Sequence, residues 1–154
     1  NLSDKADGVV NELTQRVDAV RARIAQVEHR PSVLAVEWLD PMMIGGLWMP
    51  EVIEAAGGTP LASSVGETAR TLKRSEVEEL SPEVVLLKPC GFTMEDTMEE
   101  LPVVEWIPGD RVFVTDGHTY FNRPGPRIVD SLEILASIVH PDLFPENSEA
   151  QRVW

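Results

Sequence analysis

The chain has 154 residues, the size of one domain, and 43% of them are hydrophobic, which is enough for a sizeable buried core. Its 26 acidic residues against 13 basic ones give a formal net charge of -13, which argues against nucleic acids and anionic membrane surfaces as partners. The single cysteine, Cys90, excludes an internal disulfide.

The first element in chain order is a long helix, predicted over residues 3–28. Its apolar residues are spaced alternately by three and four positions, so they fall on one stripe: Val10, Leu13, Val17, Val20, Ile24 and Val27. Ser3 or Asp4 can cap its first turn, and Pro31 lies just past its end. A coiled-coil segment and a helix packed across a domain both fit this pattern.

Strands and helices alternate along the rest of the chain. Short apolar runs predict strands, and capping residues with glycine or proline stops predict helices, with Ser75 and Thr93 as N-caps. The predicted strands are 33–36, 84–87 and 111–115, and the predicted helices are 50–56, 75–80, 93–100 and 127–139. This alternation predicts a three-layer α/β fold, with a mostly parallel sheet flanked by helices on both faces.

Aromatic residues gather at or near the carboxyl ends of these strands, where ligands bind in open α/β sheets. The strand ends carry segments 37–41, 88–92 and 116–123, and the aromatic candidates are Trp38, Trp48, Phe92, Tyr120 and Phe121. Such rings can stack on a flat ligand, and ordinary core packing is the alternative for any one of them.

The most distinctive run is Asn-Arg-Pro-Gly-Pro-Arg at 122–127. Pro124, Gly125 and Pro126 make a stiff turn that fixes the direction of Arg123. Its guanidinium could hold a phosphate, carboxylate or amide oxygen by paired hydrogen bonds, or it could form an ion pair with a nearby acid. Arg127 is expected to be structural.

Catalysis is the less favoured interpretation. Cys90 could act as a nucleophile with His118 or His140 as its base, but a free cysteine is more often a buried apolar residue. His118 could instead ligate the metal of a bound chelate. Because phosphate loops, zinc-type spacings and nucleophile elbows are all missing from the sequence, we predict no catalytic residue and no metal site of the chain's own.

From about residue 33 to residue 144 the sequence resembles the cobalamin and iron-chelate class of ABC-transporter substrate-binding proteins. The residues that carry the resemblance are EWLDP at 37–41, WMPE at 48–51, AGG at 56–58, PCGF at 89–92, YFNRPGPR at 120–127, LEIL at 132–135 and HP at 140–141. Several matches in one order are more specific than any one of them.

The resemblance implies a protein of two α/β lobes joined by a rigid helix, with the ligand in the cleft between the lobes. Residues 1–30 would be the spine helix, residues 31–154 would be the carboxy-terminal Rossmann-like lobe, and the amino-terminal lobe is missing. Segment 93–111 is shorter than the family's helical segment there, which implies a different pocket rim near Phe92.

The same resemblance implies a non-catalytic binding component of an ABC importer, which needs no cofactor and delivers a corrinoid or related metal chelate. The expected ligand contacts are Trp38, Asp40, Trp48, Phe92, Tyr120, Phe121 and Arg123. Glu76, with Glu78 and Glu79 as alternatives, would dock onto the permease. The expected location is extracytoplasmic, in the periplasm or at the cell surface, with a lipid anchor as one option. A stand-alone or cytosolic corrinoid-binding module is the alternative.

Overall fold

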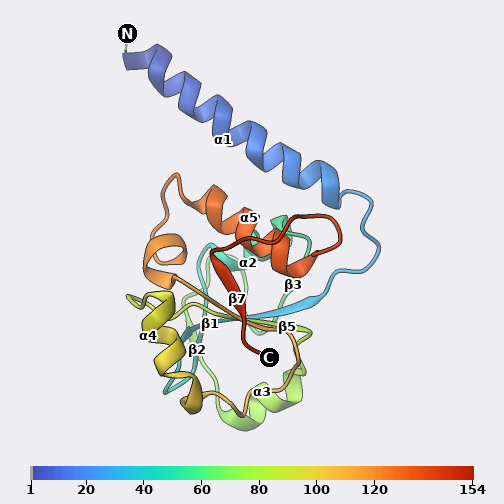
Figure 1. Cartoon of the computed structure of the whole chain (residues 1–154), viewed down its shortest axis with the longest axis vertical. Helices are drawn as coiled ribbons and strands as arrows, with labels where there is room; N and C mark the ends of the chain where they lie inside the picture. The colour runs from blue at the N-terminus through green and yellow to red at the C-terminus, as the bar shows by residue number, and fades with distance from the viewer. Residues whose placement is uncertain (1) are drawn as a thin grey trace.

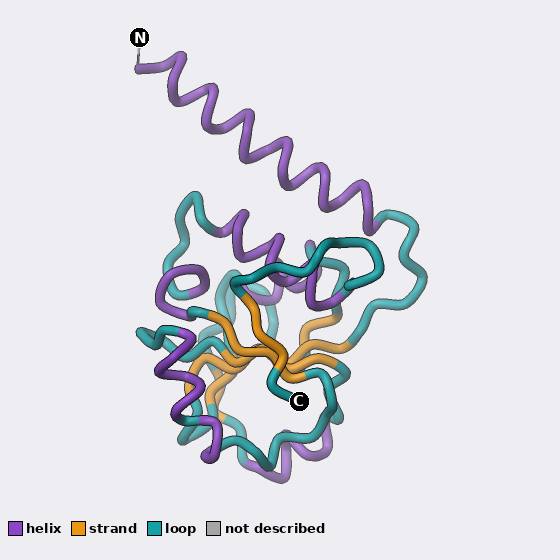
Figure 2. Tube along the Cα trace, in the orientation of Figure 1, coloured by secondary structure: helices purple, strands orange, loops and turns teal. Residues whose placement is uncertain are grey.

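The computed structural model describes residues 2–154 and contains one seven-stranded sheet with helices on both faces (Figures 1 and 2). Six strands follow the order β4-β2-β1-β5-β6-β7, and β3 pairs with β1 beside them. The strands are β1 (Ser32–Trp38), β2 (Met43–Ile44), β3 (Thr59–Pro60), β4 (Arg70–Thr71), β5 (Val84–Leu87), β6 (Val112–Thr115) and β7 (Ala150–Arg152).

The helices alternate with the strands, as predicted. They are α1 (Leu2–Ile24), α2 (Met49–Ala55), α3 (Arg74–Leu80), α4 (Met94–Glu99) and α5 (Ile128–Val139), with a 3-10 turn η1 (Leu101–Val103) and a π-helical turn η2 (Gly117–Phe121). The three central strands, β1, β5 and β6, run parallel, while β2, β4 and β7 pair antiparallel at the edges. The predicted α/β fold with a mostly parallel sheet is confirmed.

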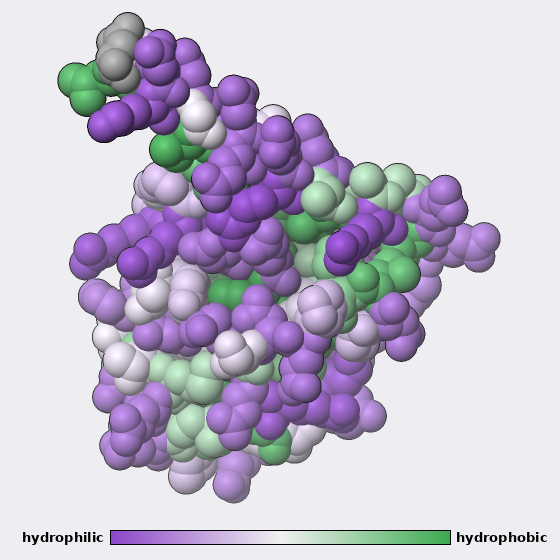
Figure 3. Space-filling model, turned by 45° about the horizontal axis from the view of Figure 1, so that its top comes forward, coloured by the Kyte–Doolittle hydropathy of each residue, from purple (hydrophilic) through white to green (hydrophobic). Residues whose placement is uncertain are grey.

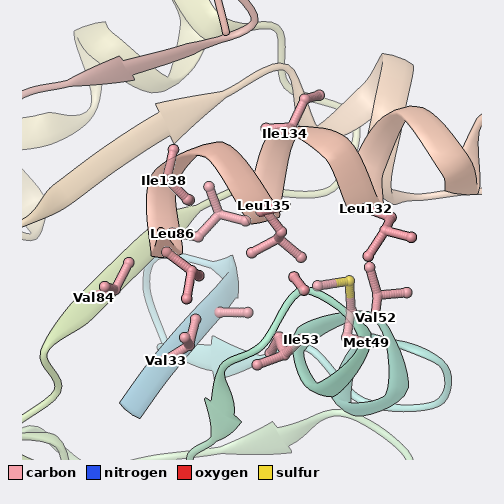
Figure 4. Close-up of a cluster of buried hydrophobic side chains, with 14 of the residues drawn as sticks. Val33, Met49, Val52, Ile53, Val84, Leu86, Leu132, Ile134, Leu135 and Ile138 are labelled. Carbon is pink, nitrogen blue, oxygen red and sulfur yellow. The ribbon is translucent and has the colours of Figure 1, made fainter. Parts of the chain in front are cut away.

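Successive side chains of a strand point to opposite faces of the sheet, and helices cover both faces here. Val33 and Ala35 of β1 pack with α2 and α5, whereas Leu34 and Val36 pack on the other face toward α3. Figure 4 shows the first of these layers, where Leu135 of α5 lies between the strands and α2. The near-continuous apolar runs of the central strands follow from this double burial.

Helix α1 packs on the rest of the chain through its carboxy-terminal half only. Val20 and Ile24 are buried against α5, whereas residues 2–12 are all exposed, and Figure 1 shows this end projecting away from the sheet. Leu2, Val9 and Val10 are more than half exposed, and apolar atoms are visible on the projecting part in Figure 3. The predicted apolar stripe exists, but the described residues cover only one end of it.

Arg16 anchors α1 to α5. Its Nε and Nη2 donate to Glu133 at 2.9 and 2.6 Å, and Nη2 also donates to Asp130 at 2.5 Å. These hydrogen bonds, Glu133 first, raise the pKa of Arg16 above its ordinary value. The pair is only partly screened by solvent, since the Arg16 side chain is 31% exposed.

We expect Arg16→Ala to lower the free energy of unfolding by about 1–2 kcal/mol, because a forked, partly buried ion pair is worth more than a surface one. Arg21→Ala is the matched control, because Arg21 pairs with Asp18 at 3.7 Å on an exposed surface and its loss should cost about 0.5 kcal/mol or less. Urea unfolding of the two variants measures both values. Equal midpoints would mean that Arg16 does not hold α1 in place.

Candidate functional site

Three loops meet at one edge of the sheet, because they follow the neighbouring parallel strands β1, β5 and β6. Hydrogen bonds join them: Cys90 N–H donates to the Glu37 carbonyl at 2.9 Å, and His118 N–H donates to the Phe92 carbonyl at 3.1 Å. Gly91 N–H also donates to Asn122 Oδ1 at 3.0 Å. The three segments that the sequence predicted at the strand ends therefore form one surface.

Gly117 allows the loop after β6 to lie directly on the loop after β5. A Cβ atom at this position would contact the carbonyl oxygen of Pro89 and would lie 2.7 Å from that of Lys88. Real side chains do not approach backbone oxygens so closely, so glycine is required here for steric reasons. The turn that carries Thr119 is further held by Asp116, whose carboxylate accepts from Thr119 N–H and Oγ1–H.

Trp38, Asp40 and Phe92 come together at this surface. The rings of Trp38 and Phe92 pack edge to face, with centroids 5.6 Å apart and planes at 75°. Trp38 Nε1–H donates to the Asp40 carbonyl at 3.0 Å, which fixes the indole. All three residues line a cavity of about 230 Å³ together with Leu39, Pro89, Glu100 and Val103.

Trp48 and Phe121 line a second cavity of about 160 Å³ beside the first loop. Its other lining residues are Glu37, Gly46, Leu47, Met49, Thr68, Ala69, Cys90 and Asn122. Trp48 is partly exposed at the start of α2, whereas Phe121 is only 1% exposed and belongs to the hydrophobic core. Phe121 therefore forms part of the cavity wall from within the core and presents almost no surface to a ligand.

Tyr120 and Arg123 lie apart from these cavities. Tyr120 is partly buried against the core, and this burial, followed by its hydrogen bond with Glu149, raises its pKa. Arg123 is exposed, and within residues 2–154 its guanidinium makes no ion pair or hydrogen bond. Arg123 therefore does not form the ion pair with a nearby acid that the sequence allowed as an alternative. Arg127, expected to be structural, reaches the Thr119 carbonyl at 3.5 Å.

Lys88 and Glu37 form a partly buried ion pair that was not predicted from the sequence. Lys88 Nζ lies 3.3 Å from Glu37 Oε2, and the two side chains are 1% and 21% exposed. Burial lowers the pKa of Lys88, and the neighbouring Glu37 opposes that shift. The signal in the sequence was the position of Lys88, immediately after the four apolar residues of β5, where its side chain can turn back into the core.

Cys90 differs from the expectation of a buried thiol, because its residue is exposed. Asn122 Nδ2 donates to Cys90 Sγ at 3.3 Å, and partial burial of the thiol raises its pKa. His140 instead binds the Gly57 carbonyl, at 3.1 Å, near the end of α2, and His118 is exposed. No histidine of the described chain is hydrogen-bonded to this thiol, so the geometry does not favour a nucleophile with a base.

Glu76 binds residues that immediately precede its own helix, α3. Its Oε2 accepts from Lys73 N–H at 2.9 Å, and its Oε1 pairs with Arg70 at 2.8 Å. Lys73 is therefore the N-cap of α3 instead of the predicted Ser75, because the Glu76 carboxylate satisfies the Lys73 backbone N–H. Glu78 pairs with Arg74, whereas Glu79 is exposed and has no ion pair among residues 2–154.

Within the described residues, no group of three or more metal-ligating side chains is placed to hold a metal ion. The same residues contain no helix that combines the length and the apolar character needed to cross a membrane.

The fold of this chain is similar to that of several solved structures. The chain matches no protein-family model and no curated protein sequence. It is similar to a periplasmic heme-binding protein from Pseudomonas aeruginosa, with a TM-score of 0.79 and 19% identity over 98% of this chain. A periplasmic heme-binding protein, RhuT, from Roseiflexus sp. RS-1 in apo form aligns with a TM-score of 0.71 and 20% identity over 90% of this chain.

A third similar structure is described as an ABC-type Fe3+-hydroxamate transport system from Saccharomonospora viridis. Its TM-score is 0.65, with 21% identity over 88% of this chain. The chain spans 59%, 56% and 49% of the length of these three proteins, respectively. At these identities the likeness concerns the fold alone, and the 154-residue chain has the fold of the matching part of each of these three proteins.

Proposed function

We propose that this chain is the ligand-binding carboxy-terminal lobe, with its spine helix, of a non-catalytic substrate-binding protein that delivers a metal chelate to an ABC permease. The observation that carries the proposal is the convergence of three strand-end loops, two of which bring Trp38, Asp40 and Phe92 together around one cavity. Such an edge is where α/β folds bind ligands, and paired aromatic rings suit a flat macrocycle.

A corrinoid is the chelate that we favour. This choice depends on the motifs shared with the cobalamin-binding class, above all PCGF at 89–92 and YFNRPGPR at 120–127. The similar structures are named for heme and Fe3+-hydroxamate, and metal chelates are the class that all these ligands have in common. Arg123, exposed and unpaired among residues 2–154, is available to bind an oxygen of the ligand.

A second lobe preceding α1 would complete the binding cleft. The chain covers about half of the length of several similar proteins, and the apolar residues on the projecting part of α1 offer a surface on which such a lobe could pack. With only one wall of a cleft, the 154-residue chain should bind its ligand more weakly than a two-lobed protein would.

For permease docking we favour Glu79 among the three glutamates considered. Both oxygens of Glu76 and one oxygen of Glu78 are used in intrahelical or neighbouring contacts, while Glu79 is exposed on the same helix. The extracytoplasmic location belongs to the same proposal, since a cytosolic corrinoid-binding module would have no permease to meet.

We expect Trp38→Ala to weaken chelate binding by about 1–2 kcal/mol, because it removes both the exposed ring surface and the edge-to-face support of Phe92. Arg123→Lys should cost about 1–3 kcal/mol if the guanidinium fork holds a ligand oxygen. Calorimetric titration of cyanocobalamin and hemin measures both, with Trp154→Ala as the aromatic control, because Trp154 is also partly exposed and lines neither of the two cavities. Unchanged affinity in both site variants would refute the assignment of the ligand to this edge.

A further inference from the structure

The 160 Å³ cavity next to the aromatic pair has a definite chemical character. It lies between the end of β1, the start of α2 and the loops that follow β5 and η2. At about 30 Å³ for each water of the liquid, the cavity has room for a group of a few heavy atoms, such as an acetamide or carboxymethyl substituent. A whole macrocycle cannot enter it.

The amide of Asn122, in the cavity wall, already has partners for both of its polar atoms. Asn122 uses Oδ1 to accept from Gly91 N–H and Nδ2 to donate to Cys90 Sγ. Lys88 is 1% exposed and is directed to Glu37 Oε2, so a ligand cannot reach its ammonium without displacing Glu37. The second oxygen of the Glu37 carboxylate, Oε1, has no hydrogen-bond partner among residues 2–154.

Glu37 Oε1 is therefore the charged acceptor that a ligand group meets in this cavity. Trp48 and Thr68 add neutral donors, which an amide or a carboxylate of the ligand could use equally. A primary amide can donate its N–H to Glu37, and hydrogen bonds to an ionised acceptor are the stronger kind. A ligand carboxylate would instead bring a second negative charge into contact with Glu37, and like charges at contact repel.

We propose that this cavity is a subsite that accepts a primary amide at the edge of the chelate and rejects a carboxylate, with Glu37 as the specificity-determining residue. Lys88 is the positioning residue, since its ion pair holds Glu37 Oε2 and leaves Oε1 of this cavity-lining side chain without a partner among residues 2–154. The inference rests on the proposed function and narrows it to chelates with amide-bearing edges, as corrinoids have, over those with carboxylate edges, as heme has.

The test compares two ligands that share ring and metal and differ only at the edge: dicyanocobinamide, which carries primary amides, and dicyanocobyrinic acid, which carries carboxylates. Absorbance titration of the 154-residue chain in 1 M NaCl suppresses the general repulsion from its net charge of -13, because the screening length is then about 3 Å. We expect the amide ligand to bind at least about tenfold more tightly, since like charges at contact are strongly disfavoured.

Glu37→Gln should reduce this ratio to about threefold or less, because a neutral side-chain amide both accepts and donates. Glu105→Gln is the matched control and should leave the ratio unchanged, since Glu105 is exposed and has no ion pair in the described chain. If Glu37→Gln does not fold, Glu37→Gln with Lys88→Met removes both charges together and should narrow the ratio equally.

Equal affinities for the two ligands, or a ratio that survives in the Glu37 variants, would overturn the subsite. Binding of hemin without either corrinoid would also overturn it while leaving the proposed function intact. If cobinamide, cobyrinic acid, hemin and a ferric hydroxamate all fail to bind, the proposed function itself falls, and the subsite falls with it.

Discussion

Replacing Glu37 with leucine is expected to destabilise the chain by about 3–5 kcal/mol, because it leaves the ammonium of Lys88 buried without a counter-ion. Lys88 has one of the largest side chains among those that are less than 2% exposed, so it cannot reach water without rearranging the core around Gly45 and Met49. Urea unfolding at neutral pH measures the loss.

The pH dependence of the free energy of unfolding is a second test of the Glu37→Leu variant. Burial lowers the pKa of Lys88 in the folded chain, so the unfolded chain binds more protons at pH values between the folded and unfolded pKa. Stability should therefore rise with pH across that interval, and more steeply in Glu37→Leu, where no carboxylate opposes the shift. A Glu37→Leu chain with the parent's stability and pH profile would contradict a charged, buried Lys88.

The double variant Glu37→Leu with Lys88→Met is the control for this result. It replaces the ion pair by apolar side chains of similar size, which is often neutral or stabilising. It should recover most of the stability lost in Glu37→Leu. If both variants are equally unstable, the cost comes from altered packing around Glu37 and the unpaired charge is not its cause.

The second large effect is expected at Gly117. Gly117→Ala should lower the free energy of unfolding by about 1–3 kcal/mol or more, because the added methyl group meets the carbonyl oxygens of Pro89 and Lys88, which are backbone atoms and yield little. For a domain of this size, each kcal/mol corresponds to a shift of about 2–4 °C in the melting temperature.

Gly125→Ala is the matched control for that prediction. Gly125 lies in the connection between η2 and α5, and a Cβ there has no atom within 4 Å. Its melting temperature should stay close to the parent's, whereas that of Gly117→Ala should fall. An equal fall in both variants would mean that the loss reflects glycine's backbone freedom and not the close approach of the two loops.

The central architecture could be predicted because its signals are local. The strand at 84–87 coincides with β5, since four successive apolar residues buried on both faces leave little doubt about its ends. Thr93 caps α4 as expected, because its hydroxyl accepts from Asp96 N–H at 3.2 Å while Asp96 returns a bond to Thr93 N–H. The placement of Trp38, Asp40 and Phe92 at one edge followed from the same strand assignment.

The features that were missed depend on contacts that no periodic pattern in the sequence marks. The strands β2 and β4 have two residues each and exist only through pairing with their neighbours, so no periodic pattern marks them. Lys73 caps α3 where Ser75 was expected, because Glu76 supplies the capping contact. The burial of Phe121 depends on η2 turning that ring into the core. Lys88 was overlooked because only the fold brings Glu37 within reach.

Titration of the chain with cyanocobalamin, hemin and a ferric hydroxamate, followed by calorimetry and absorbance, tests directly whether the chain binds a metal chelate. We expect at least one of these chelates to bind with one molecule per chain and without chemical change in the ligand, and we expect Trp38→Ala to weaken that binding. Absence of binding by all three chelates at millimolar concentration, or binding that Trp38→Ala, Arg123→Lys and the Glu37 variants leave untouched, would contradict it.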